Sequence, residues 1–173
     1  MTRLLIAFVL AAAACTPAER SPPPGAAQEE PALLVAPATR TVLSGEQAMA
    51  LARQCSRISP GLVESTWTPS AAELDALDNA LAAYLAQRLE QAGSTASPGE
   101  YYRQAAGFVI GGRRVIYVNG VHSGAVERVN PNHPFDWRTQ AHMICDGGAI
   151  TFGVEYDPAT SQLSNFAFNG SVG

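Results

Sequence analysis

Histidines and carboxylates are the residues of this chain that could perform acid–base chemistry. The three histidines are His122, His133 and His142, separated by eleven and nine positions. These separations match no short metal-binding spacing such as His-x-x-x-His, so we expect no metal site. A hydrolase would need one of these imidazoles close to a carboxylate. The candidate carboxylates are Asp136, Asp146, Glu155 and Asp157.

Ordinary structural roles account for these groups without catalysis. Asp146 and Asp157 lie in predicted turns, where aspartate side chains hydrogen-bond to nearby backbone. Glu155 is expected on the wet face of a strand near the Arg113–Arg114 pair, and His142 on a sheet face. No Gly-x-Ser-x-Gly nucleophile elbow occurs. We therefore predict neither catalytic residues nor a cofactor.

A long loop rich in contact-forming residues is the more suitable candidate for a binding surface. Loops of about fifteen residues are unusual in compact domains and tend to be functional. Aromatic side chains, in addition, often dominate the energy of protein interfaces. The candidate binding residues are His122, Asn130, Asn132, His133, Phe135 and Trp137. The alternative is that Phe135 and Trp137 only fix the loop onto the core.

Two helices are predicted to precede the strands that position this loop. Ser44-Gly-Glu-Gln47 is a capping-box pattern, and we expect a helix from there to Arg57 that carries Cys55. Ser70-Ala-Ala-Glu73 is a second capping box, with Thr68-Pro69 as an alternative start. The leucines that follow at spacings of three and four form one apolar stripe, which requires a packing surface. They are Leu74, Leu77, Leu81, Leu85 and Leu89.

The remaining sequence predicts an antiparallel meander. Gly111-Gly112 is typical of a two-residue hairpin turn, and because it separates two strands it is not a phosphate-binding loop. A second hairpin is expected around Asp146-Gly147-Gly148. In residues 150–156 apolar and polar side chains alternate, which predicts one packed face and one wet face. The expected strands are residues 107–110, 113–118, 139–145, 149–156 and 163–169.

These elements predict an α+β fold with two N-terminal helices, the longer packed on a five-stranded antiparallel meander sheet. Residues 41–173 suffice for one domain with its own core. The arrangement resembles cystatin-like and other folds in which a helix lies on a curved sheet. That resemblance concerns architecture alone and implies no site residue.

The N-terminal residues predict a location at a membrane surface. After Arg3, the eleven apolar residues from Leu4 to Ala14 are too few for a spanning helix, which needs about 20, and match a secretory signal. Ala12-Ala13-Ala14-Cys15 resembles the lipobox of bacterial lipoproteins. The resemblance implies that residues 1–14 are removed and that Cys15 carries the lipid. Since Thr16 replaces the aspartate that retains lipoproteins at the inner membrane, it also implies the outer membrane, facing the periplasm. An ordinary signal peptide with an incidental cysteine is the alternative.

Residues 16–40 contain six prolines and predict a disordered tether behind the lipidated cysteine. With Cys15 lipidated, Cys55 and Cys145 remain, and an oxidising periplasm favours a disulfide between them. Two buried free thiols, or a cysteine–histidine nucleophile, are the alternatives. The eleven basic residues are all arginine, against fifteen acidic ones, and form no basic stripe. We therefore expect no nucleic-acid binding.

Two functions follow from these observations. The first is a non-enzymatic periplasmic binding module, tethered to the outer membrane, whose partner is an envelope component or a protein, as for small inhibitor or immunity lipoproteins. The second is a small envelope hydrolase or ligand-binding enzyme that uses His142, His122 and acidic residues on the sheet face. A purely structural lipoprotein is a third interpretation.

Overall fold

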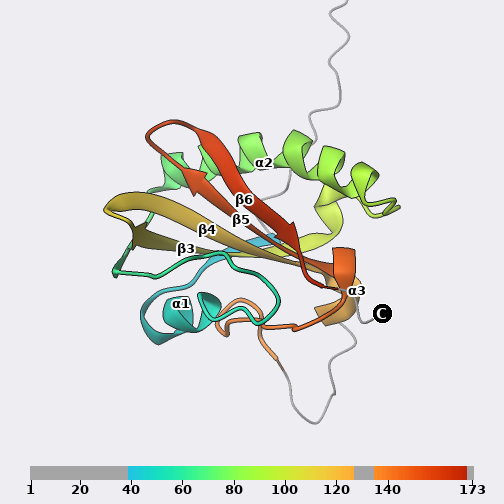
Figure 1. Ribbon diagram of the computed structural model, residues 1–173, viewed down its shortest axis with the longest axis horizontal. Helices are drawn as coiled ribbons and strands as arrows, with labels where there is room; N and C mark the ends of the chain where they lie inside the picture. Colours follow the sequence, from blue (N-terminus) through green and yellow to red (C-terminus); the bar gives the residue numbers. More distant parts are fainter. Residues whose placement is uncertain (1–38, 127–134, 171–173) are drawn as a thin grey trace, which may run out of the picture. The chain divides into compact units, whose positions relative to one another are not determined.

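The chain forms an α+β fold built on a six-stranded mixed sheet. Helices lie against this sheet (Figure 1). The structure is a computed structural model that describes residues 39–126 and 135–170. The predicted signal, Cys15 and most of the tether lie outside the described residues, as do Asn130, Asn132 and His133.

Four strands form an antiparallel meander in the order β3-β4-β5-β6. They are β3 (Tyr101–Ile110), β4 (Arg113–His122), β5 (Thr151–Asp157) and β6 (Gln162–Phe168). The predicted hairpin at Gly111-Gly112 is confirmed. Both glycines have positive φ angles, 57° and 72°, as the tight hairpin turn between β3 and β4 requires.

Two further strands pair with the outer edge of β3, and the sequence analysis missed both. β1 (Arg40–Val42) runs parallel to β3, and β2 (Ser65–Trp67) runs antiparallel to it. Each has only three residues, too few to show the alternation by which strands are recognised. The sheet is therefore mixed, and the prediction of a purely antiparallel five-stranded meander is wrong. β1 also begins at Arg40, the last residue of the predicted tether.

The predicted strand at residues 139–145 and its hairpin at residues 146–148 do not form. Side-chain amides replace a strand partner there. Gln104 accepts from the backbone N–H of His142 at 2.7 Å and donates to the carbonyl of Gln140 at 2.5 Å, while Asn119 donates to the carbonyl of His142 at 2.9 Å. Because β4 pairs directly with β5, this segment is not inserted between them as a strand. It crosses the sheet face as an irregular cover.

The long helix α2 (Ala71–Gln91) covers one face of the sheet, and its predicted capping box at Ser70 and Glu73 is confirmed. Its leucine stripe is buried against β3, β4 and β5. Asp78 adds a polar contact to this layer, since its carboxylate pairs with Arg103 of β3 and with Arg40 of β1. In the described part of the chain, no helix is both long and apolar enough to cross a membrane.

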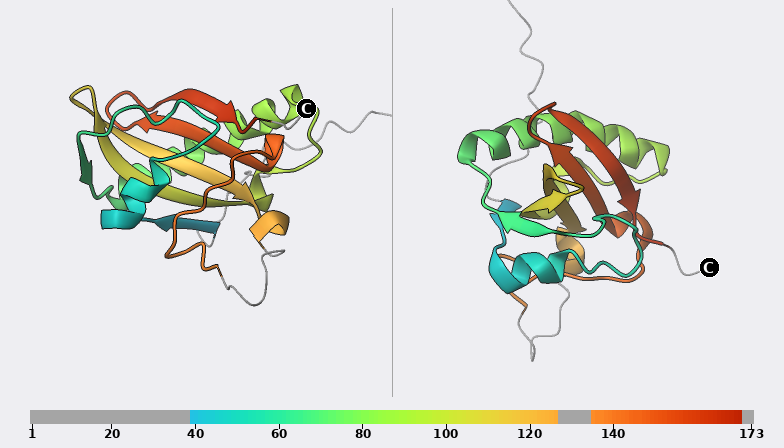
Figure 2. Two further views of the ribbon diagram at one scale, coloured as in Figure 1. Left: turned by 60° about the horizontal axis from the view of Figure 1, so that its bottom comes forward. Right: turned by 60° about the vertical axis from the view of Figure 1, so that its left-hand side comes forward.

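The second face of the sheet is also covered, which corrects the prediction of a wet face. The helix α1 (Gly45–Leu51), the segment 52–64 and the segment 135–150 lie over it (Figure 2). Glu155, predicted on the surface, is only 3% exposed. Three short helices complete the fold: α3 (Ser123–Val126), η2 (Pro98–Glu100) and η3 (Gly148–Ile150).

α1 begins where predicted but ends at Leu51 instead of Arg57, and its predicted capping box does not form. Ser44 makes no side-chain cap bond, and Gln47 instead accepts a hydrogen bond from the N–H of Ala141 at 2.8 Å. The side chain of Gln54 donates to the carbonyl of Leu51 at 3.0 Å, in the last turn. Cys55 therefore lies beyond the helix.

Candidate functional site

Two large apolar side chains are exposed on the segment between α1 and β2. Ile58 is 98% exposed and Leu62 is 87% exposed. Their neighbours Arg57, Ser59 and Pro60 are buried. Isolated exposed apolar residues are common on proteins and need no explanation. Here, however, Ile58 lies between the buried Arg57 and Ser59. Residues 57–62, which we call the Ile58 loop, therefore expose Ile58 and Leu62 while Arg57 and Ser59 are buried.

Ser59 fixes the centre of the Ile58 loop to the sheet. Its hydroxyl donates to Oε1 of Glu155 on β5 at 2.6 Å. The second oxygen of this carboxylate accepts from Nδ2 of Asn165 on β6 at 3.0 Å. From β4, the hydroxyl of Tyr117 donates to the carbonyl of Ser59 at 3.2 Å. Both the side chain and the backbone of Ser59 are thus bound, directly beside the exposed Ile58.

Arg57 fixes the start of the loop. Its Nη2 donates to Oδ1 of Asn119 on β4 at 2.5 Å. Burial lowers the pKa of the Arg57 guanidinium and raises the pKa of Tyr117 to about 12, so the Tyr117 hydroxyl keeps its proton at neutral pH. Gly153 makes room for the pair, because a Cβ there would lie 2.6 Å from the Tyr117 hydroxyl and 3.0 Å from Nε of Arg57.

The predicted disulfide between Cys55 and Cys145 is confirmed, with a Cα–Cα distance of 5.1 Å. It joins the segment that leads into the Ile58 loop to the segment 135–150. Asn119 connects the same two segments, since it accepts from Arg57 and donates to the carbonyl of His142. The Ile58 loop is therefore held at its base by a covalent bond and at its centre by buried hydrogen bonds. Such preorganisation lowers the entropic cost of binding.

The predicted binding loop contributes aromatic side chains that pack on the domain. The Trp137 ring is buried and stacks on Tyr102, with ring centroids 4.5 Å apart and planes at 10°. The Phe135 ring meets the edge of His142 at 4.9 Å. These contacts correspond to the alternative in which the two aromatics fix the loop to the core. A binding role for the loop stays a prediction, because its central residues lie outside the described part of the chain.

His122 is the last residue of β4 and lies beside a carboxylate, in a hollow of about 460 Å³. Its Nε2 is 3.8 Å from Oε1 of Glu100, and its Nδ1 accepts the backbone N–H of Gly124 at 3.2 Å. The backbone N–H of Ser97 holds the pKa of Glu100 below its ordinary value. With Nδ1 occupied as an acceptor, the proton of the neutral ring resides on Nε2. The ring thus has no free lone pair with which to act as a general base.

His142 is buried, and desolvation lowers its pKa. In the described residues its ring makes no ion pair with any of the candidate carboxylates. Asp136 accepts from the N–H of Arg138, and Asp157 accepts from the N–H of Ala159, so both serve local turns. Within residues 39–126 and 135–170, no three metal-ligating side chains gather. The histidines and carboxylates considered for the hydrolase alternative are therefore not brought together in the described residues.

The arginine pair predicted near Glu155 lies elsewhere. Arg113 is 3.7 Å from Asp157, and Arg114 is 3.3 Å from Glu73. Arg114 also lies 3.7 Å over the ring of Trp67.

The sequence analysis missed the Ile58 loop, because the predicted helix extended to Arg57. A signal was present, since Ile58 and Leu62 flank a Ser-Pro-Gly sequence, which favours a turn with exposed neighbours. No protein-family model, curated protein or solved structure matches this chain.

Proposed function

We propose that this protein is a non-enzymatic binding module, tethered to the outer membrane and facing the periplasm, that binds a protein partner through the Ile58 loop. One observation carries the proposal. Ile58 is 98% exposed between Arg57 and Ser59, whose side chains are bound to the sheet. Burying such a side chain at an interface contributes about 1.5–3 kcal/mol. Because the loop is already ordered, little of that gain is lost on binding.

The proposed location of this module at the outer membrane rests on the resemblance of Ala12-Ala13-Ala14-Cys15 to a lipobox. A lipid on Cys15 and the proline-rich tether behind it would keep the domain at the membrane and leave the loop free to reach a neighbour. The partner is then an envelope protein, as for small inhibitor or immunity lipoproteins.

The hydrolase alternative has less support. It requires a histidine and a carboxylate within hydrogen-bond reach in a pocket. Nε2 of His122 and Oε1 of Glu100 are 3.8 Å apart. Nδ1 of His122 already accepts the N–H of Gly124, and Nε2 carries the proton of the neutral ring. No nucleophile is hydrogen-bonded to this ring in the described residues.

Site-specific crosslinking in cells tests the binding function. A photo-reactive amino acid at position 58 should give a crosslink to one defined envelope protein. The same amino acid at position 91, an exposed residue at the end of α2, is the matched control and should not. Leu62→Asp should abolish the crosslink from position 58, because a carboxylate cannot enter an apolar contact. Equal crosslinks from positions 58 and 91, or a product unaffected by Leu62→Asp, would contradict the proposal.

Cys15→Ser tests the membrane address separately. The variant should remain unprocessed or appear in the soluble periplasmic fraction, whereas Cys55→Ser, which removes another cysteine, should not release the protein. If Cys15→Ser stays as membrane-bound and as fully processed as the wild type, Cys15 is not the lipid attachment site.

A further inference from the structure

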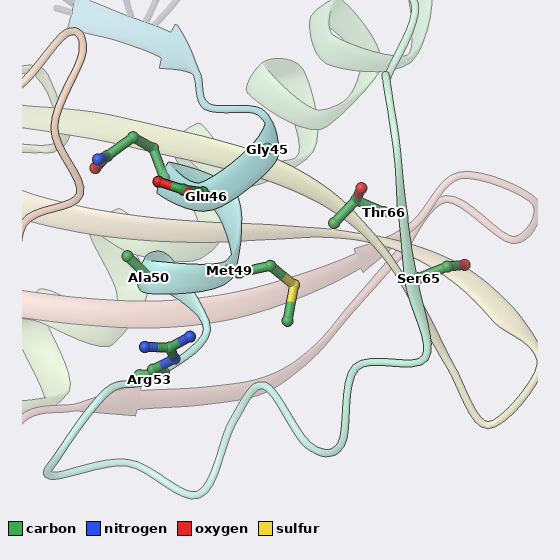
Figure 3. A pocket seen from close by; sticks show the side chains of 8 residues that line it. Gly45, Glu46, Met49, Ala50, Arg53, Ser65 and Thr66 are labelled. Atoms are coloured by element: carbon green, nitrogen blue, oxygen red, sulfur yellow. The ribbon is translucent and has the colours of Figure 1, made fainter.

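A hollow of about 870 Å³ lies between α1 and β2, at an edge of the sheet. Its lining includes Glu46, Met49, Ala50 and Arg53 on the helix side and Ser65 and Thr66 of β2 on the strand side. Figure 3 shows the side chain of Met49 directed from α1 toward the strand that carries Ser65 and Thr66. We propose that this hollow binds an extended peptide segment of a partner protein, which adds to β2 as a strand. This second binding site goes beyond the function proposed for the Ile58 loop.

The strand side of the hollow supplies the main-chain contacts. In the described chain, β2 forms a ladder with β3 only. The other edge of β2 therefore presents backbone N–H and C=O groups without a strand partner. Such an edge is a template for an added strand. Several classes of peptide-binding domain bind their ligands in this way, with main-chain hydrogen bonds for affinity and pockets for specificity.

The helix side supplies the side-chain specificity. Glu46, Met49 and Ala50 lie on α1 at the i, i+3, i+4 spacing that places residues on one face. Arg53 follows two residues after the end of the helix at Leu51 and also lines the hollow. An acidic group therefore lies at one end of the hollow, apolar groups at its middle and a basic group at its other end. In the described residues, neither Glu46 nor Arg53 forms an ion pair. The charges are thus available to a ligand with the complementary order.

The dimensions of the two sides agree. The seven residues of α1 extend over about 10 Å at a rise of 1.5 Å per residue. The three residues of β2 extend over about 10 Å as well. In an extended peptide every second side chain points the same way. In a five-residue segment the first, third and fifth side chains therefore face α1, and the first and fifth residues lie about 13 Å apart. A segment that runs antiparallel to β2 fits the two charged ends of the hollow when its first residue is basic, its third aliphatic and its fifth acidic.

The peptide acetyl-Lys-Thr-Val-Thr-Glu-amide is the probe for this site. The chain has three methionines, of which Met49 lies in the hollow and Met143 is exposed on the segment 135–150. Methyl-labelled methionine in the full chain, kept in detergent micelles, reports binding by NMR. The peptide should shift the Met49 methyl signal and leave the Met143 signal unchanged. A peptide with N-methylated backbone amides should bind at least tenfold more weakly, since it cannot form strand hydrogen bonds.

A charge swap tests the side-chain part of the proposal. Arg53→Glu should weaken binding of the Lys…Glu peptide about fivefold and strengthen binding of the matching Lys…Lys peptide by a similar factor, as expected for exposed charge pairs. Arg113→Glu, the same change at an exposed arginine outside the hollow, is the control and should alter neither.

Three results would overturn the inference: no shift of Met49 at millimolar peptide, equal binding of the N-methylated peptide, or no change of preference in Arg53→Glu. The site is also distinguishable from the Ile58 loop. Leu62→Asp should leave peptide binding intact, and Arg53→Glu should leave the crosslink from position 58 intact.

Discussion

The hydrogen bond between Ser59 and Glu155 allows a quantitative test of how the Ile58 loop is held. Both side chains are buried, at 5% and 3% exposure, and their oxygens are 2.6 Å apart. Ser59→Ala removes the hydroxyl and leaves the Glu155 carboxylate with Asn165 as its remaining side-chain partner. A hydrogen bond to a charged group contributes about 1.5–3 kcal/mol. We therefore expect Ser59→Ala to lower the free energy of unfolding by about 2 kcal/mol.

Urea unfolding followed by tryptophan fluorescence measures this loss, because Trp67 and Trp137 both pack against the sheet. The midpoint should fall while the slope of the transition stays unchanged, which separates lost stability from a change in the denatured state. In a thermal scan the same loss corresponds to a decrease in Tm of about 8 °C for a domain of this size.

A double-mutant cycle with Glu155→Gln isolates the bond itself. If the hydroxyl acts through the carboxylate, the two changes should be non-additive by about 1 kcal/mol or more. Ser164→Ala is the matched control. It removes an exposed hydroxyl from β6 opposite Glu155 and should cost less than about 0.5 kcal/mol. A loss in Ser59→Ala no larger than that of the control, or additive effects in the cycle, would refute the reasoning.

Three further predictions concern the remaining supports of the fold. Joint replacement of Cys55 and Cys145 by serine should lower the free energy of unfolding by at most about 4.6 kcal/mol, the chain-entropy value for their separation of 90 residues, measured by urea unfolding with and without reductant. Burial lowers the pKa of His142, so its contribution to stability is fully present above about pH 6.5, the ordinary pKa of the unfolded chain. The free energy of unfolding should decrease as the pH falls below that value, and His142→Gln should lack this part of the pH dependence. Gly120→Ala should cost about 1–3 kcal/mol or more, because its Cβ would lie 2.0 Å from the buried Phe152 ring, whereas Gly99→Ala, with no atom within 4 Å, should be nearly neutral.

Elements with a complete local signal could be predicted from the sequence. The leucine stripe of α2 and its capping box at Ser70 lie within one segment and need no other part of the chain to be recognised. The hairpin at Gly111-Gly112 likewise depends on two residues that tolerate positive φ. The disulfide was predicted by counting, since Cys55 and Cys145 remain once Cys15 is assigned to the lipid.

Elements defined by distant partners could not be predicted in this way. Residues 139–145 have strand-like composition, yet Gln104 and Asn119 satisfy backbone groups that a neighbouring strand would otherwise bind. β1 and β2 are strands only because the edge of β3 is open to them. In each case the decisive hydrogen-bonding group lies at least 20 residues away in the sequence, so no local pattern contains it.

The features of the candidate sites also separate into those with a local sequence signal and those set by distant parts of the chain. By itself, the sequence determined an N-terminal signal pattern, a pair of cysteines, a leucine-faced helix and the absence of a catalytic motif. Only the tertiary structure decided that the second face of the sheet is covered and that Glu155 is buried beneath Ser59. It also decided that Ile58 is exposed and that Met49 faces β2. The physical reason is that burial depends on all the segments packed around a residue, whereas the sequence displays only those beside it in the chain.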